Sequence, residues 1–258
     1  MSHSLLIAGL VLTGLPAFPQ VKGAIRYKDA VFSAVAVKKN LSYSRADPVA
    51  THRFDWYEPQ RDSTSRRPLV IWMHGGGFRF GSKHMKSIRI WCDFFARRGY
   101  VCAAINYQLG KKNLSFRFDD LVKNCYRALG DVRLAIAWFK ANAIRLRIDT
   151  SRIILAGNSA GGMLALQATY GTDAGLLQLM HNPDSANASH RVDPGQIAAV
   201  INFGAASLIP PGCETRGCRS CRSMVRKIRS CPTAINRFLC MAAAIFSALP
   251  VRLASRPG

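Results

Sequence analysis

Short, unbroken apolar runs punctuate this chain and predict its strands. Four runs have strand length: Leu69–Met73, Tyr100–Tyr107, Arg152–Ala156 and Ile197–Gly204. Uninterrupted apolar residues, instead of an alternation of apolar and polar ones, are typical of strands that are buried on both faces. We therefore expect these runs to form the centre of one sheet.

Stretches with helical periodicity lie between the apolar runs. From Asp119 to about Ile148, apolar residues recur at spacings of three and four, which predicts one face of a long helix. Shorter helices are predicted around Met85–Gly99 and from Ala160 to Gly171. Strands that alternate with helices favour an α/β fold with a mostly parallel sheet, covered by helices on both faces.

The region before the first central run predicts a different kind of strand. Three extended runs, Ala24–Asp29, Val35–Ser44 and Thr51–Pro59, are rich in β-branched and aromatic residues and are separated by turn formers. This pattern indicates antiparallel strands that lead into the parallel sheet.

An apolar run at the N-terminus, Leu5–Leu15, has the length of a signal-peptide core and is too short to span a bilayer. We interpret residues 1–20 as a signal peptide, which predicts a secreted or periplasmic protein without stable membrane insertion. The segment before this run carries no Lys or Arg, so a buried N-terminal segment in a cytoplasmic protein is the alternative.

The C-terminal part of the chain shows neither the helical nor the strand periodicity of apolar residues. Residues 212–258 carry nine Lys or Arg against one acidic residue, and five of the eight cysteines. We therefore divide the chain into a partial α/β domain over 25–211 and a basic, cysteine-rich tail over 212–258, for which no fold is predicted.

The net charge of +22 raises nucleic acid as a partner, but the sequence does not favour it. No basic helix face is interleaved with aromatic residues, and no nucleic-acid-binding signature is found. The pair Cys218 and Cys221 forms a single C-x-x-C, and no histidine follows His190, so no metal site is predicted.

The stretch Gly157-Asn158-Ser159-Ala160-Gly161 follows a predicted strand and precedes a predicted helix. A strand-turn-helix elbow of this kind presents a nucleophilic serine above the sheet, and its small flanking residues relieve crowding. A glycine-rich turn without chemistry is the alternative for the motif alone.

A second motif, His74-Gly75-Gly76-Gly77-Phe78, directly follows the predicted strand Leu69–Met73. Attack on an ester places negative charge on the carbonyl oxygen, and glycines allow backbone N–H groups to approach that oxygen. The N–H of Ala160 would be a third donor. A flexible loop is the alternative, but the pairing with the serine motif in this chain order favours the chemical interpretation.

Residues from about Phe54 to Gly171 resemble the α/β-hydrolase superfamily, in its carboxylesterase and hormone-sensitive-lipase-like branch, which includes bacterial esterases related to feruloyl and acetyl-xylan esterases. The resemblance rests on "FDWYEP", "RPLVIWMHGGGFRFGSK", "FARRGYVCAAINYQL", "DVRLAIAWFKANA" and "IDTSRIILAGNSAGG". One departure is Gln108, where many relatives have an arginine that makes a local salt bridge.

The resemblance implies a carboxylic-ester hydrolase that needs no metal or organic cofactor. It implies Ser159 as the nucleophile, an oxyanion hole from Gly76, Gly77 and Ala160, and a loop-shaping role for His74 and Gly75. The implied substrate is a small-molecule or carbohydrate-linked ester. The acyl and alcohol groups and the oligomeric state do not follow from the sequence.

The family's acid and base, which follow the serine in chain order, are not found. Only His181 and His190 come after Ser159, in a polar stretch. The acidic residues of that region are Asp173, Asp184 and Asp193, and none follows a later predicted strand. We interpret both histidines as solvated residues. The hydrolase is therefore predicted to be incomplete at the C-terminal edge of its sheet.

Two hypotheses account for the missing residues. The first is a shifted or misassigned reading frame near Leu208–Cys213, beyond which the authentic protein supplies the later strands with Asp and His. The second is a genuine short relative with a basic tail. An active esterase and a catalytically inactive relative or binding protein therefore both stay open.

Overall fold

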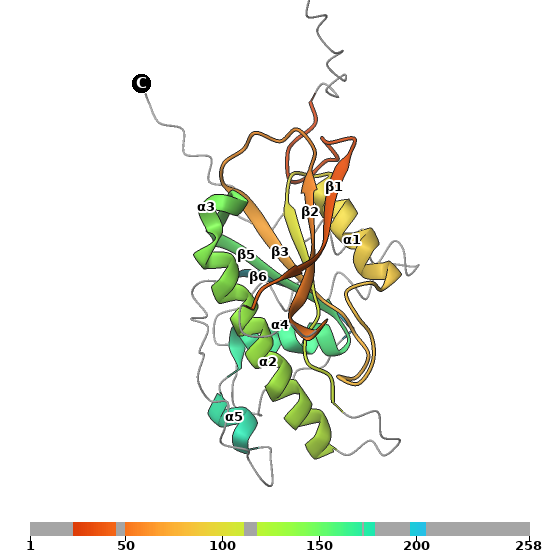
Figure 1. Ribbon diagram of the computed structural model, residues 1–258, viewed down its shortest axis with the longest axis vertical. Coiled ribbons are helices and arrows are strands. Elements are labelled where there is room, and N and C mark those ends of the chain that lie inside the picture. Colours follow the sequence, from red (N-terminus) through yellow and green to blue (C-terminus); the bar gives the residue numbers. More distant parts are fainter. Residues whose placement is uncertain (1–22, 45–49, 111–117, 172, 179–196, 205–258) are drawn as a thin grey trace, which may run out of the picture.

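A computed structural model describes residues 23–44, 50–110, 118–171, 173–178 and 197–204. Its strands are β1 (Val35–Ser42), β2 (Arg53–Pro59), β3 (Arg67–Met73), β4 (Val101–Ile105), β5 (Ile148–Asn158) and β6 (Ile197–Phe203). They form one sheet in the order β1-β2-β4-β3-β5-β6 (Figure 1). The strands β4, β3, β5 and β6 are parallel, whereas β2 is antiparallel to both β1 and β4. The mostly parallel sheet with leading antiparallel strands is confirmed.

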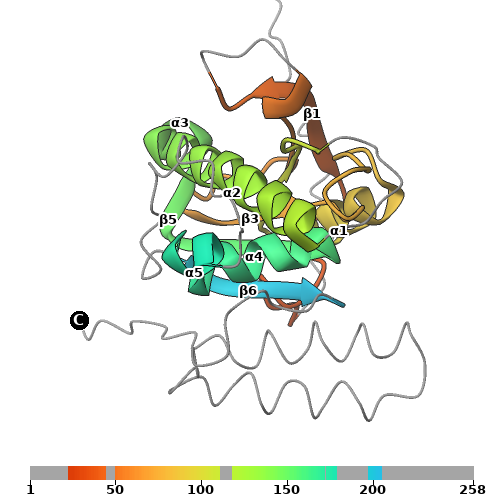
Figure 2. The same ribbon diagram turned by 90° about the horizontal axis from the view of Figure 1, so that it is seen from below.

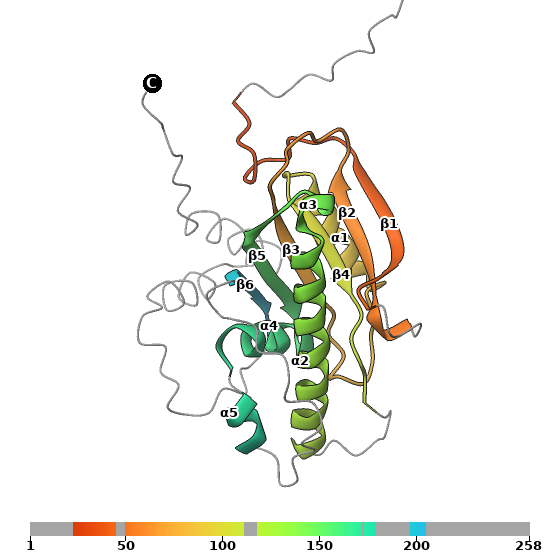
Figure 3. The same cartoon turned by 60° about the vertical axis from the view of Figure 1, so that its left-hand side comes forward.

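Helices cover both faces of this sheet. They are α1 (Lys86–Ala96), α2 (Phe118–Ala141), α3 (Ala143–Leu146), α4 (Ala160–Tyr170) and α5 (Asp173–Gln178), with a short 3₁₀ turn at Ala50–His52. Helix α1 packs on one face, and α2 runs along the other (Figure 3). Helix α4 lies against β5 and β6, and α5 contacts α2 (Figure 2).

Strand β3 explains why the central runs are apolar without interruption. Leu69, Ile71 and Met73 join the core under α2 and α4, while Val70 and Trp72 join the core under α1. All five are fully buried. Because each face of the strand meets a helical layer, neither face can carry polar side chains without loss of burial energy.

Two sequence-based expectations about local structure are wrong. Residues Ala24–Asp29 form a turn, in which the N–H groups of Lys28 and Asp29 donate to the carbonyl of Ile25. Arg26 there makes two hydrogen bonds to the Asp62 carboxylate, at 3.0 and 2.7 Å, so a long-range ion pair overrides the local strand preference.

The long helix α2 also ends earlier than the expected position near Ile148. It stops at Ala141, and the side chain of Asn142 donates to the carbonyl of Trp138 at 2.8 Å. A separate turn, α3, follows and ends at Arg147, which has a left-handed φ of 53°. The chain then enters β5 at Ile148, four residues before the expected strand.

The predicted signal peptide and the basic tail lie outside the described residues, and so do His181 and His190. The described part of the 25–211 domain ends shortly after β6, so the expected incompleteness of the sheet beyond β6 stays a prediction. None of the described helices combines the length and the apolar character that a membrane span requires.

Candidate active site

Ser159 occupies the sharp turn between β5 and α4. Its backbone has φ 50° and ψ −120°, a region that residues other than glycine rarely adopt. The neighbouring elements impose this conformation, since the Ser159 N–H donates to the Phe203 carbonyl at 2.9 Å and the Ser159 carbonyl accepts from the Met163 N–H at 3.0 Å. The side chain is exposed at the carboxyl edge of the parallel strands.

Two glycines let the turn pack this tightly. A Cβ on Gly161 would lie 2.1 Å from the carbonyl oxygen of Met73, and a Cβ on Gly157 would lie 2.3 Å from the carbonyl carbon of Gly161. Both contacts are with backbone, which cannot move aside cheaply. Small residues on both sides of Ser159 are therefore a steric requirement of the helix docking, as the sequence motif predicts.

The glycine loop follows β3 on the adjacent parallel strand. Gly76 and Gly77 have positive φ values of 118° and 58°. A Cβ on Gly76 would lie 2.2 Å from the Phe80 carbonyl oxygen, and the Gly76 carbonyl accepts the N–H groups of Arg79 and Phe80 at 3.0 Å each. The loop thus folds back on itself beside the serine turn.

His74 lies buried beneath this loop. Its ring is 1% exposed, stacks on Tyr107 at 4.3 Å between ring centroids, and donates from Nδ1 to the Gly75 carbonyl at 2.8 Å. Burial lowers the pKa of His74, which favours the neutral ring. The Tyr107 hydroxyl donates to the His74 carbonyl at 2.6 Å. These contacts fit the predicted loop-shaping role.

Asn158 joins the two motifs, although the sequence analysis gave it no role. Its Oδ1 accepts the Gly75 N–H at 3.1 Å. The only sequence signal was its place as the variable residue of G-x-S-x-G, which by itself specifies nothing about a bond across 83 positions.

Lys83 closes the far end of the glycine loop and was also missed. Its Nζ donates to Asp55 Oδ1 at 2.6 Å and to Asn40 Oδ1 at 2.7 Å, and both ionic side chains are 1% exposed. The Lys83 N–H donates to Asn106 Oδ1 at 2.8 Å. A buried lysine needs such partners because desolvation of an isolated charge is costly, and the pair ties the loop to β2.

Gln108, the departure from the resembled family, contacts a carboxylate on α2 through its backbone N–H. The Gln108 N–H donates to Asp131 Oδ2 at 2.6 Å, and His52 Nε2 lies 2.9 Å from Asp131 Oδ1. The Asp131 carboxylate therefore has both a backbone N–H and a histidine as partners.

Among the described residues, no histidine forms a hydrogen bond with Ser159. His52 contacts Asp131, His84 lies 3.5 Å from Asp55, and His74 contacts Gly75. The remaining acidic candidate described, Asp173 in α5, pairs with Arg133 on α2. The described part of the chain also holds no cluster of three or more His, Cys, Asp or Glu that could bind a metal ion.

Comparison with known proteins places this arrangement in a family. The family model described as BD-FAE matches residues 54–216, which include both the glycine loop and the serine turn. The chain belongs to the BD-FAE family. The order of its strands and the helical layers on both faces of the sheet are those of an α/β-hydrolase.

Relatives of this BD-FAE member include named esterases. Esterase-5C of Drosophila pseudoobscura pseudoobscura is 35% identical over 41% of this chain and 19% of its own length. The probable carboxylic ester hydrolase LipM of Mycobacterium tuberculosis is 30% identical over 45% of this chain and 24% of its own length. The chain therefore spans a quarter or less of these relatives.

A similar solved structure is Thermogutta terrifontis esterase 2 phosphorylated by paraoxon, with 25% identity and a TM-score of 0.46. The match covers 67% of this chain and 58% of that chain.

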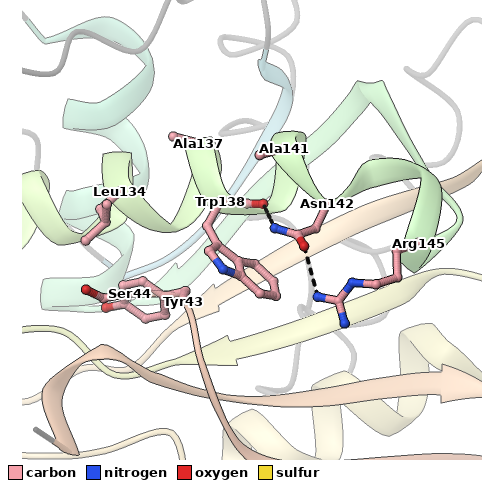
Figure 4. Close-up of a pocket in the computed structure, with 8 residues that line it drawn as sticks. All are labelled: Tyr43, Ser44, Leu134, Ala137, Trp138, Ala141, Asn142 and Arg145. Atoms are coloured by element: carbon pink, nitrogen blue, oxygen red, sulfur yellow. Dashed lines mark hydrogen bonds between the residues drawn. The ribbon is translucent and has the colours of Figure 1, made fainter. Parts of the chain in front are cut away.

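A hollow of this BD-FAE member lies away from the serine turn. It is an open cleft of about 760 Å³ between the end of β1 and the second half of α2 (Figure 4). Its lining is Tyr43, Ser44, Leu134, Ala137, Trp138, Ala141, Asn142 and Arg145. It shares no residue with the serine turn or the glycine loop.

Proposed function

We propose that this protein hydrolyses carboxylic esters, with Ser159 Oγ as the nucleophile. The observation that carries the proposal is the backbone of Ser159, held at φ 50° and ψ −120° between a buried parallel strand and a helix. Such strain persists only where the surrounding structure enforces it, and it lifts the hydroxyl out of the sheet toward a substrate. Family membership supports the same chemistry.

The second part of the proposal is an oxyanion hole formed by the N–H groups of Gly76, Gly77 and Ala160. Gly76 and Gly77 are half-buried, and no described acceptor bonds to their N–H groups. Ala160 is the first residue of α4, where the helix dipole favours negative charge. Donors that are already oriented stabilise the tetrahedral oxyanion without reorganisation during the reaction.

The reaction follows from these groups and a general base. Ser159 Oγ attacks the ester carbonyl while the base takes its proton. When the tetrahedral intermediate collapses, the bond to the alcohol oxygen breaks, and the leaving alcohol takes the proton from the base. Water then attacks the acyl-serine in the same site and releases the acid. The proposed substrates are small-molecule or carbohydrate-linked esters.

A catalytically inactive relative or binding protein is the second candidate. The observation that favours it is the engagement of every described histidine with groups other than Ser159. A serine hydroxyl without a base loses several orders of magnitude in rate.

A fluorophosphonate probe and an activated p-nitrophenyl ester separate the two candidates. The unaltered full chain should be labelled on Ser159 and hydrolyse the ester, and Ser159→Ala should lose labelling and at least about 10³-fold in kcat. Ser151→Ala is the matched control, because Ser151 lies near the start of β5 and hydrogen-bonds Asp149. Absence of labelling in a folded, unaltered chain would refute hydrolysis and leave the inactive relative.

A further inference from the structure

We infer that Asn158 is a positioning residue, whose side-chain carbonyl sets the orientation of the oxyanion loop relative to the nucleophile. This inference rests on the proposed ester hydrolysis and adds a residue to its machinery. It concerns the hydrogen bond from the Gly75 N–H to Asn158 Oδ1.

The two sets of proposed oxyanion donors come from different segments of the chain. Gly76 and Gly77 belong to the loop after β3, whereas Ala160 begins the helix after β5. Their separation must stay fixed, because donors are effective only within hydrogen-bond distance of one oxyanion. Asn158 is the last residue of β5, next to Ser159, and its bond to Gly75 spans the two segments directly.

The peptide group between His74 and Gly75 is held from both sides. Its carbonyl accepts the Tyr107 hydroxyl at 2.6 Å, and its N–H donates to Asn158 Oδ1 at 3.1 Å. In a trans peptide the carbonyl and the N–H point in opposite directions, so these two bonds fix the rotation of the whole plane. Without the Asn158 side chain, only the bond from the Tyr107 hydroxyl would hold this peptide group.

The next two peptide planes of the loop follow the first one directly, and their carbonyls are also occupied. The Gly75 carbonyl accepts from His74 Nδ1 at 2.8 Å, and the Gly76 carbonyl accepts two backbone N–H groups at 3.0 Å. Because both peptides are trans, the N–H groups of Gly76 and Gly77 point away from those occupied carbonyls. Asn158 thus holds the first of three consecutive peptide planes, and the two proposed donors belong to the second and third.

The contact also explains the first glycine of the loop. A Cβ on Gly75 would lie 2.8 Å from Asn158 Nδ2 and 2.9 Å from the Asn158 carbonyl oxygen. Gly75 does not have a positive φ, so its conformation alone does not require glycine. Glycine is required because the amide of Asn158 occupies the space of a side chain. The absence of a side chain on Gly75 leaves space for the Asn158 amide, and the oxygen of that amide accepts the Gly75 N–H.

The test compares Asn158→Ala, which removes the acceptor, with Asn158→Asp, which keeps a carboxylate oxygen in its place. Asn142→Ala is the matched control, because Asn142 also makes one side-chain bond to backbone, at Trp138, on a different face of the molecule. The first measurement is amide hydrogen exchange of the loop peptides by mass spectrometry in the full chain, and it does not require activity.

We expect Asn158→Ala to accelerate exchange at Gly75 by about tenfold, the effect of one lost hydrogen bond. Asn158→Asp should restore slow exchange, and Asn142→Ala should leave the loop unchanged. With the activated ester, Asn158→Ala should lower kcat by about tenfold with KM unchanged, and Asn158→Asp should recover most of that loss.

Two results would overturn the inference. One is unchanged loop exchange in Asn158→Ala, and the other is faster exchange without any loss of kcat in an active protein. If the unaltered chain neither hydrolyses the ester nor reacts with the fluorophosphonate, the proposed function fails, while the exchange data still decide whether Asn158 holds the loop.

Discussion

The two ends of β3 are held in place by opposite kinds of chemistry. At its amino end, Arg67 is 1% exposed and donates to Glu58 Oε2 at 3.0 Å and to the Leu146 carbonyl at 2.9 Å, with Asp62 3.9 Å away. At its carboxyl end, the first loop residues after His74 are fixed by neutral hydrogen bonds and by glycine contacts with backbone, and the ion pair of Lys83 lies only at the far end of the loop.

The difference teaches how the same strand serves structure and chemistry. Burial of a guanidinium costs desolvation energy, which only several polar partners offset. Such an arrangement suits an end of the strand with a structural role. An end with the proposed role of stabilising a transient anion needs N–H groups that stay available for a ligand, and neutral partners beside them provide this without competing charges. The following three predictions test this difference between the two ends of β3.

The largest effect is expected where the carboxyl end is packed by glycine. Gly161→Ala places a Cβ 2.1 Å from the Met73 carbonyl oxygen, so α4 cannot dock as it does now. We expect the free energy of unfolding to fall by more than about 3 kcal/mol, measured by urea denaturation.

Gly130→Ala in α2 is the control for that substitution. A Cβ there meets nothing within 4 Å, so the helix preference of alanine should stabilise the protein by about 0.5 to 1 kcal/mol. Equal effects of the two substitutions would contradict the steric account of the serine turn.

At the amino end, Arg67→Met should lower the free energy of unfolding by about 3 kcal/mol, because it leaves the partly buried Glu58 and the buried Asp62 with one cationic partner fewer. Arg66→Met is the matched control one residue away. Arg66 pairs with Asp149 but is 69% exposed, so we expect a change below about 1 kcal/mol. Similar losses in both variants would argue against a special role for the buried guanidinium.

The smallest effect concerns pH and the neutral ring at the carboxyl end. Burial lowers the pKa of His74 below that of the unfolded chain, so at pH below about 6.5 the unfolded state binds more protons than the folded state. The stability from the neutral ring is complete above that pH and is lost as the pH falls toward the lower pKa of the folded state.

One such proton changes the free energy of unfolding by at most about 1.4 kcal/mol per pH unit. We expect His74→Asn to show a shallower loss of stability between about pH 6.5 and 5 than the unaltered protein. Chemical denaturation at several pH values measures this slope. Parallel slopes would show that the folded protein does not hold His74 neutral.

The sequence by itself determined the features that depend on local pattern. Unbroken apolar runs predicted β3 and β4, since such runs are typical of strands that are covered on both faces, and every residue of these two strands is buried. The glycines around Ser159 predicted a tight strand-to-helix turn, because the lack of a Cβ is a property of the residue itself. The chain order of the two motifs favoured a chemical interpretation of both.

Only the tertiary structure decided which distant groups meet. The local preference of Ala24–Asp29 for a strand yielded to the ion pair between Arg26 and Asp62. The Asn158 bond to Gly75 and the burial of Lys83 against Asp55 join residues 83 and 28 positions apart. Hydrogen bonds and ion pairs of this kind depend on the packing of whole elements, and no periodicity along the chain encodes them.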